Sequence, residues 1–285
     1  MMRCMPSANA KLTAEAFNAA LPALSFFFRT NPRREKFKSV RQFAIALSFA
    51  CVARVAFGQG GPPMITDDPG TPGSGKWENN FAIILEHRPG ETPIDVPEID
   101  LNYGLGDHIQ LTLQTAPVLL KRSGHGLIGG IGGTEAAVKC RFLNEATDGF
   151  DISMFPRVIF NVTQSSVRRG LAEDGTSFQI PFEAAKTFGR WHLDVEFGPR
   201  AITIGRSEWF DGIVCGFDLT KSTMLMAELH DESRMNFSRD VLTLNFGLRH
   251  EFTENYILIV SMGHEVRSPD QPTALIGYFG MQFVY

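Results

Sequence analysis

This sequence of 285 residues lacks several features by which common protein classes are identified. It holds only four cysteines, and neither Cys140 nor Cys215, the two beyond the N-terminal region, lies in a CxxC pair or another metal-ligand spacing. The formal net charge is only −4, so the charge balance gives no reason to expect a nucleic acid as a partner. A mean hydropathy of −0.05 is too polar for a bundle of membrane helices. A membrane β-barrel is still allowed, because its strands are only half apolar.

The N-terminal region resembles an export signal. Four basic residues precede a short apolar run from Phe43 to Val52, and small residues follow, with a cleavage site expected near Gly58. The run is too short to span a bilayer as a helix. Residues 1–35 indicate a start site assigned too far upstream, with an unusually long leader as the alternative. We therefore assign residues 1–58 to a leader with a signal peptide, 59–75 to a Pro/Gly-rich periplasmic or lumenal segment, and 76–285 to a barrel.

Apolar and polar residues alternate with period two from Trp77 to the end of the chain. Between Val241 and Phe252, for example, Leu244 and Phe246 alternate with Asn245 and Arg249. This pattern is typical of strands with one apolar face, and it recurs in about twelve segments. Cys140 and Cys215 fall on apolar strand faces, as small lipid-facing residues would. The sequence predicts an all-β protein, an antiparallel transmembrane up-and-down β-barrel of about twelve strands.

Short and long connections alternate between these segments. Tight turns such as Gly189-Arg190 contrast with long links, which we expect at residues 88–96, 118–133, 162–177, 231–239 and 267–273. Within the second link, Gly129 to Gly133 predict a mobile external loop. Outer-membrane barrels have short periplasmic turns and longer external loops, and an even strand number places both termini in the periplasm.

A soluble β-sandwich or lipocalin-like barrel would alternate in the same way. Two features favour the membrane: the apolar face persists through every strand, and the chain ends on Phe283-Val284-Tyr285. This ending resembles the terminal strand through which outer-membrane proteins are passed to the barrel-assembly machinery. We therefore expect a bacterial outer-membrane location, with the assembly machinery and membrane lipid as partners.

The segment before the first strand carries a more specific pattern. Thr66, Asp67, Asp68 and Pro69 are followed by Gly75-Lys76 and then by Trp77 and Glu78. This start resembles the mature chain of an outer-membrane β-barrel family that is named for the phenol meta-cleavage degradation pathway and whose members are often called transporters. The resemblance implies uptake of aromatic or other small hydrophobic compounds. By themselves, Asp67 and Asp68 are expected to accept hydrogen bonds in turns rather than to bind Ca²⁺.

Ionisable residues cluster on the polar faces of the strands. Charges are costly on the lipid side, so we expect them in the lumen. For any single residue, an ion pair that stabilises the barrel is the simpler interpretation; a permeation path that favours cations is the functional one. The candidate permeation residues are Glu98, Asp100, Arg141, Arg157, Glu196, Arg200, Glu228, Arg249, Glu251 and Glu265.

These patterns predict a passive outer-membrane channel or transporter for small molecules, with no cofactor, no metal and no catalytic residue. The first alternative is a structural barrel with a closed lumen. The second is a membrane-embedded lipid hydrolase that would use Ser238 and the outward-facing His250. No Gly-x-Ser-x-Gly motif accompanies these two residues, which makes catalysis the weakest hypothesis.

Overall fold

The computed structural model describes residues 61–285, so the predicted leader and signal peptide lie outside the described part of the chain. Strands dominate this part, and no helix in it is long and apolar enough to cross a membrane. The elements in chain order are β1 (Trp77–His87), β2 (Glu91–Gly104), β3 (Ile109–Arg122), β4 (Ile128–Leu143), α3 (Glu145–Asp148), β5 (Asp151–Met154), β6 (Arg157–Asn161), α4 (Gln164–Arg169), β7 (Ser177–Gln179), β8 (Phe182–Phe188), β9 (Trp191–Ile202), β10 (Glu208–Asp218), β11 (Thr223–Arg234), β12 (Val241–Thr253), β13 (Tyr256–Arg267) and β14 (Leu275–Val284).

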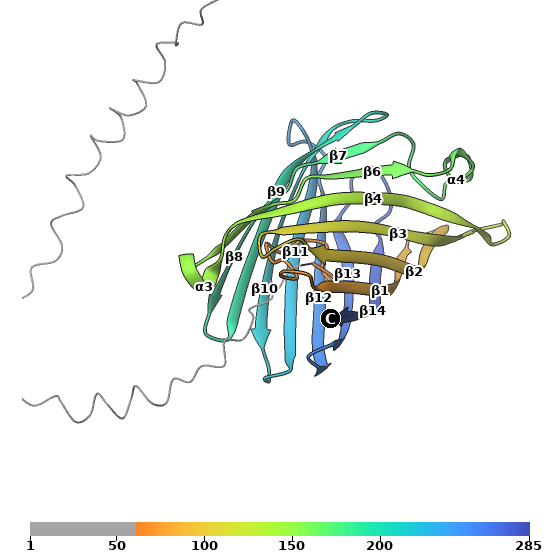
Figure 1. The fold of residues 1–285 in the computed structure, drawn as a ribbon. Helices are drawn as coiled ribbons and strands as arrows, with labels where there is room; N and C mark the ends of the chain where they lie inside the picture. Colours follow the sequence, from red (N-terminus) through yellow and green to blue (C-terminus); the bar gives the residue numbers. More distant parts are fainter. Residues whose placement is uncertain (1–60) are drawn as a thin grey trace, which may run out of the picture. The chain divides into compact units, whose positions relative to one another are not determined.

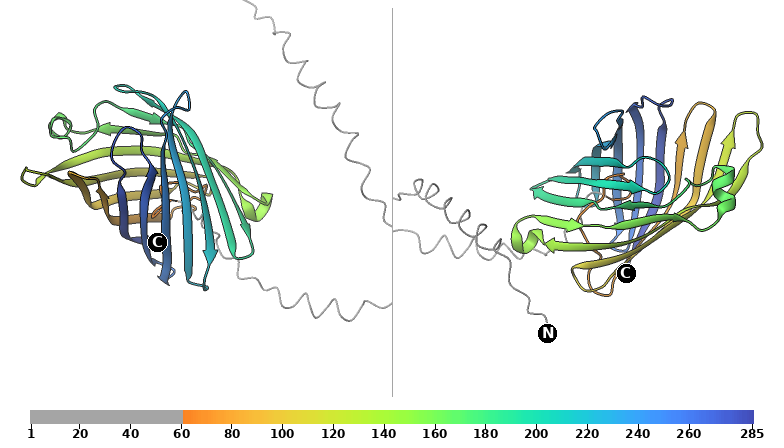
Figure 2. Two further views of the ribbon diagram at one scale, coloured as in Figure 1. Left: turned by 180° about the vertical axis from the view of Figure 1, so that it is seen from behind. Right: turned by 90° about the horizontal axis from the view of Figure 1, so that it is seen from above.

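The strands form one closed antiparallel barrel (Figures 1 and 2). Strands that follow one another in the chain pair, except β5 with β6 and β7 with β8, and β14 pairs with β1 to close the wall. The segments β5 and β6 both pair with β4, while β7 and β8 both pair with β9. Each of these two couples is therefore one interrupted strand, and the wall has twelve strands, which confirms the predicted fold class.

Prolines cause the two interruptions. Phe155-Pro156 separates β5 from β6, and Ile180-Pro181 separates β7 from β8. Proline has no N–H to give to a β-ladder, so pairing stops there. The breaks lie side by side, because the Phe155 N–H donates to the Pro181 carbonyl at 3.0 Å. Phe155 itself is only 3% exposed, and its ring lies against Lys139 and Arg157 on the lumen side.

Outward and inward side chains alternate as predicted. On β12, Leu244 and Phe246 are 37% and 58% exposed, whereas Asn245 between them is 1% exposed. Cys215 is exposed on the outer face of β10. The interior is polar and buried, and the exterior is apolar and exposed, which is the reverse of a soluble protein. Transmembrane β-barrels have this arrangement, with polar side chains towards the lumen and apolar side chains towards the lipid.

Two of the predicted long links were wrong. Residues 91–96 belong to β2, so the connection from β1 is a tight turn at residues 88–90. Gly129 to Gly133 belong to β4 and pair with β3, so they are not a mobile loop. In both places the ladder shifts register beside a proline, near Pro97 and at Pro117. A register shift moves side chains to the opposite face, which hides the period-two pattern in the sequence.

The two ends of the barrel differ. The end that we call the turn end holds Tyr285 and the connections β2–β3, β4–β5, β8–β9, β10–β11 and β12–β13. The opposite end, the loop end, holds the connections β1–β2, β3–β4, β6–β7, β9–β10, β11–β12 and β13–β14. At the loop end, the connection from β6 to β7 folds inward. Its Leu171 is 5% exposed and packs on Val118, Leu120 and Ile128 of β3 and β4. A Cβ at Gly130 would lie 2.7 Å from Leu171 Cδ1, so glycine there permits the close approach.

Candidate functional site

The candidate site is the lumen together with residues 61–75, which we call the lumenal segment. This segment precedes β1 and lies among the strands in both views of Figure 2. Two wall carboxylates bind three of its consecutive backbone N–H groups. The N–H groups of Ile65 and Thr66 donate to Glu228 at 3.1 and 2.6 Å, and that of Asp67 donates to Glu196 at 2.9 Å. Hydrogen bonds to ionised acceptors are stronger than neutral ones, so β9 and β11 fix the segment in place.

The opposite side of the segment meets cations of the wall. Arg157 Nη2 lies 2.6 Å from Asp67 Oδ2 and 3.0 Å from Glu196 Oε1. Lys139 donates to the carbonyl of Asp68 and lies 3.4 Å from Glu183. These contacts tie the segment to β4 and β6, so it is held on both sides of the lumen.

Asp68 closes a turn within the segment, as the sequence predicted. Its Oδ1 accepts the Gly70 N–H at 2.6 Å. The barrel wall encloses this carboxyl, although part of its surface borders a cavity. This enclosure raises the pKa of Asp68; the nearby Lys139 charge and the Gly70 N–H act in the opposite direction.

Wall glycines leave room for the segment. A Cβ at Gly212 of β10 would overlap Thr66 Oγ1, and one at Gly247 of β12 would overlap the terminal methyl of Met64. Met64 is buried against Val214, Met224 and Met226. The close fit indicates that the segment is part of the folded barrel interior and not a loose tail.

A cavity of about 300 Å³ remains beside the lumenal segment. Its polar lining comes mostly from β1 to β4. Asp100 accepts hydrogen bonds from the side-chain amides of Asn80 and Asn102 at 2.8 and 3.0 Å, and Glu98 accepts one from Gln114. These partners of the two carboxylates are uncharged amides.

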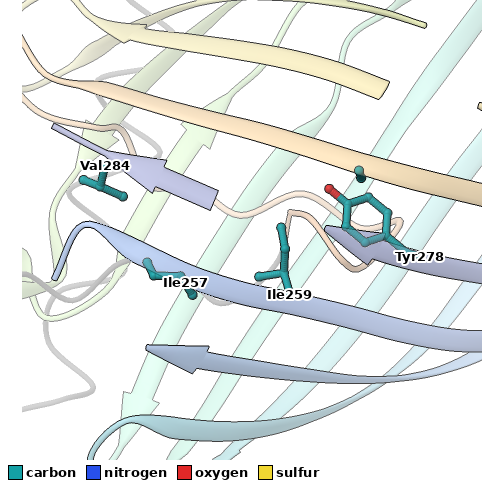
Figure 3. Close-up of a cluster of buried hydrophobic side chains, with 5 residues drawn as sticks. Ile257, Ile259, Tyr278 and Val284 are labelled. Carbon is teal, nitrogen blue, oxygen red and sulfur yellow. The ribbon is translucent and has the colours of Figure 1, made fainter. Parts of the chain in front are cut away.

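One side of the lumen is apolar. Ile257, Ile259, Tyr278 and Val284 are buried on the inner face of β13 and β14, with Ile84 of β1 packed beside them (Figure 3). Ile84 and Tyr278, together with Ile276, also line the cavity. The cavity thus has an apolar wall next to an acidic one.

The ten predicted permeation residues lie at three levels and not in one cluster. Glu98, Asp100, Arg157 and Arg249 line the cavity, and Glu196 and Glu228 hold the lumenal segment. Towards the loop end, Arg200 pairs with Glu208 and Glu232, and Glu265 pairs with Arg88. Near the turn end, Arg141 lies 4.0 Å from Asp151, and the Glu251 N–H donates to Ser222.

The residues of the N-terminal motif separate into two groups. Thr66, Asp67, Asp68 and Pro69 lie in the lumen, where Thr66 and Pro69 are fully buried, and Glu78 lines the cavity. Trp77 lies on the outer surface at the turn end, 36% exposed, and its ring centroid is 4.9 Å from that of Tyr103.

Three acidic residues in the lumen could in principle hold a metal ion. One carboxylate oxygen from each of Asp67, Glu183 and Glu196 lies within 4.8 Å of the others. Each of these three acids already has an ion pair with Arg157 or Lys139. The arrangement is therefore better explained as an ion-pair network that anchors the lumenal segment.

Sequence reasoning left open whether residues 59–75 are periplasmic or lumenal, and it did not identify their partners Lys139 and Glu183 as parts of the site. It also did not detect the inward-facing Ile257 and Ile259, because it treated inward positions as polar. The only signal for the insertion was the Thr66–Pro69 motif, whose carboxylates and small turn residues suit an enclosed polar space.

A second cavity, of about 550 Å³, lies at the loop end above the lumenal segment. Its lining includes Ile65 of the segment and Leu171 of the inward-folded connection. Five glutamates line it, and four of them are ion-paired: Glu86 and Glu265 with Arg88, Glu91 with Arg122, and Glu232 with Arg200.

No protein-family model and no curated protein matches the sequence. Several solved structures match the fold. An outer-membrane channel of the COG4313 group from Pseudomonas putida F1 has a TM-score of 0.61 and 13% identity, covering 77% of this chain and 99% of that one. The NanC porin has a TM-score of 0.54 at 7% identity, and the KdgM porin in complex with disordered oligogalacturonate 0.50 at 11%; each match covers 72% of this chain and 98% of the other. At these identities the likeness shows the fold, which is that of the twelve-stranded bacterial outer-membrane barrels.

Proposed function

We propose that this protein is a passive outer-membrane channel for small molecules, with a lumen constricted by residues 61–75. The observation that carries the proposal is the polar lumen, which keeps a cavity of about 300 Å³ beside the lumenal segment inside a closed barrel. Transmembrane barrels combine a polar interior of this kind with an apolar outer band.

The outer surface supports a membrane location. Aromatic side chains gather at the turn end, where Trp77, Trp191, Tyr256 and Tyr285 are each more than one third exposed. At the loop end, the rings of Trp209 and Phe237 stack with centroids 6.4 Å apart. Aromatic residues at both ends of an apolar band match the two interfaces of a bilayer. In this orientation the turn end and the C-terminus face the periplasm.

The substrate part of the proposal rests on the N-terminal motif. The resemblance of Thr66–Pro69 and Trp77-Glu78 to the family named for the phenol meta-cleavage pathway favours small aromatic or hydrophobic compounds. The cavity agrees in size with a single small ring, because about 300 Å³ is at the lower limit of small-molecule pockets.

A structural barrel with a closed lumen is the second candidate. The lumenal segment and the inward-folded β6–β7 connection both narrow the path, which favours this alternative. The hydrolase hypothesis has little support. Ser238 lies before β12, near the loop end, and His250 lies towards the turn end of the same strand. His250 is nine residues beyond the start of β12 at Val241, which is roughly 30 Å of strand at about 3.3 Å per residue.

Conductance measurements separate the first two candidates. The purified, refolded protein is added to planar lipid bilayers, and heat-unfolded protein serves as the control. A channel is expected to give discrete conductance steps that the unfolded sample does not give. Folded barrel that inserts into the bilayer without any steps would favour the closed structural barrel.

A further inference from the structure

Acidic side chains outnumber basic ones in the lining of the cavity. Six acidic and three basic side chains line it: Asp67, Asp68, Glu78, Glu98, Asp100 and Glu135, against Lys139, Arg157 and Arg249. Two of the three bases are also shared with acids outside the cavity lining, since Lys139 pairs with Glu183, and Arg157 pairs with Glu196. The excess of acidic over basic side chains around the cavity is therefore larger than the six against three in its lining.

Glu98 and Asp100 concentrate this excess on one strand. They are two residues apart on the inner face of β2, and they are 4% and 6% exposed. Their hydrogen-bond partners are neutral amides, from Gln114 for Glu98 and from Asn80 and Asn102 for Asp100. These amides supply hydrogen bonds but no positive charge, so a cation or a further hydrogen-bond donor would complete the site.

The same cavity offers an apolar surface. Ile84, Ile276 and Tyr278 lie beside the acidic side chains, and Pro62 and Pro63 of the lumenal segment add to the lining. A solute that only carries charge would leave these groups without a partner. One with an apolar ring and a polar head would satisfy both parts of the lining.

We propose that the cavity selects small aromatic solutes whose head group is cationic or a neutral hydrogen-bond donor, and that it rejects aromatic carboxylates of the same size. This inference rests on the proposed channel function and adds the head-group class to it.

The test compares three single-ring probes of similar size at neutral pH. Benzylguanidinium is a cation, benzamide is a neutral donor and benzoate is an anion. Their entry into proteoliposomes is measured with protein-free vesicles as the background. We expect benzylguanidinium to enter at least about tenfold faster than benzoate, because like charges placed together in a recognition site are strongly disfavoured. Benzamide should fall between the two.

Variants test whether the acidic wall causes the preference. The double substitution Glu98→Gln and Asp100→Asn should bring the benzylguanidinium-to-benzoate ratio towards one, and Glu98→Gln alone should lower it in part. Glu254→Gln, at an exposed position between β12 and β13, is the matched control and should keep the wild-type ratio. Heat-modifiable migration in gels confirms that each variant has folded, and the single variant keeps the test possible if the double variant does not fold.

The outcomes separate the two proposals. Equal entry of benzoate and benzylguanidinium through the wild-type protein, or a ratio unchanged in the Glu98 variants, would overturn the selectivity and leave the channel standing. If no probe enters faster than in protein-free vesicles, the channel function itself is contradicted.

Discussion

Asp67 and Arg157 join the lumenal segment to the barrel wall through an ion pair of 2.6 Å, with side chains that are 16% and 13% exposed. The two residues are 90 positions apart in sequence, and only one of them belongs to a strand. Substitution of either residue breaks the ion pair, but only substitution of Arg157 also changes a strand of the wall.

Substitution at Arg157 should affect the stability of the barrel more than substitution at Asp67. Arg157→Gln leaves Asp67, Glu135 and Glu196 without their shared cation and should lower the free energy of unfolding by about 3–5 kcal/mol. Asp67→Asn removes only one carboxylate and should cost less. Urea unfolding of the two variants in lipid vesicles measures the difference. Equal losses would contradict the shared role of Arg157.

Two neighbouring residues of β3 test which face meets lipid. Leu113 is outward and 49% exposed, whereas Gln114 lines the cavity and donates to Glu98. Leu113→Arg should cost about 2–4 kcal/mol if it lies near the bilayer midplane. Gln114→Arg should cost much less, because Glu98 can pair with the new cation. Unfolding in lipid vesicles checks both, and the reverse order of costs would favour a soluble β-barrel.

The closing seam should be needed for assembly. Trp77 and Tyr285 exchange backbone hydrogen bonds of 2.7 and 3.0 Å, and Asn79 donates to the Tyr285 hydroxyl. Deleting residues 283–285 should leave the edges of β1 and β14 unpaired in lipid, where unsatisfied backbone groups are costly. The expected result is loss of the heat-modifiable band in gels. Tyr285→Phe, which keeps the backbone pairs, is the control and should assemble.

The fold was largely predictable because the lipid side of a barrel tolerates few polar residues. On β12 the alternation of Leu244, Asn245 and Phe246 was sufficient to assign both faces. The sequence does not reveal how full the lumen is. Asn245 donates to Glu228 at 2.9 Å and also lies 4.0 Å from the sulfur of Met64. A large side chain at position 245 would therefore meet the lumenal segment, although alternation alone predicts that it would be tolerated there.

The site was less predictable for two physical reasons. A period-two pattern assigns a residue to one face of the wall, but it does not give the position of the residue along the barrel axis. Arg141 and Glu251, near the turn end, were therefore predicted as permeation residues in the same way as Glu98, which lines the cavity. Segments without regular structure give no periodic signal at all. The contacts of Ile65, Thr66 and Asp67 are made largely through backbone N–H groups, which any residue except proline could supply.

The central claim is that the lumenal segment constricts an otherwise open channel. It is tested most directly by single-channel conductance of Gly212→Ala, with Gly277→Ala as the matched control. The added methyl at position 212 overlaps Thr66, whereas at position 277 nothing lies within 4 Å of the new Cβ. The account predicts that Gly212→Ala displaces the segment and raises the conductance, while Gly277→Ala conducts like the wild type. Equal conductance of all three folded proteins would contradict it.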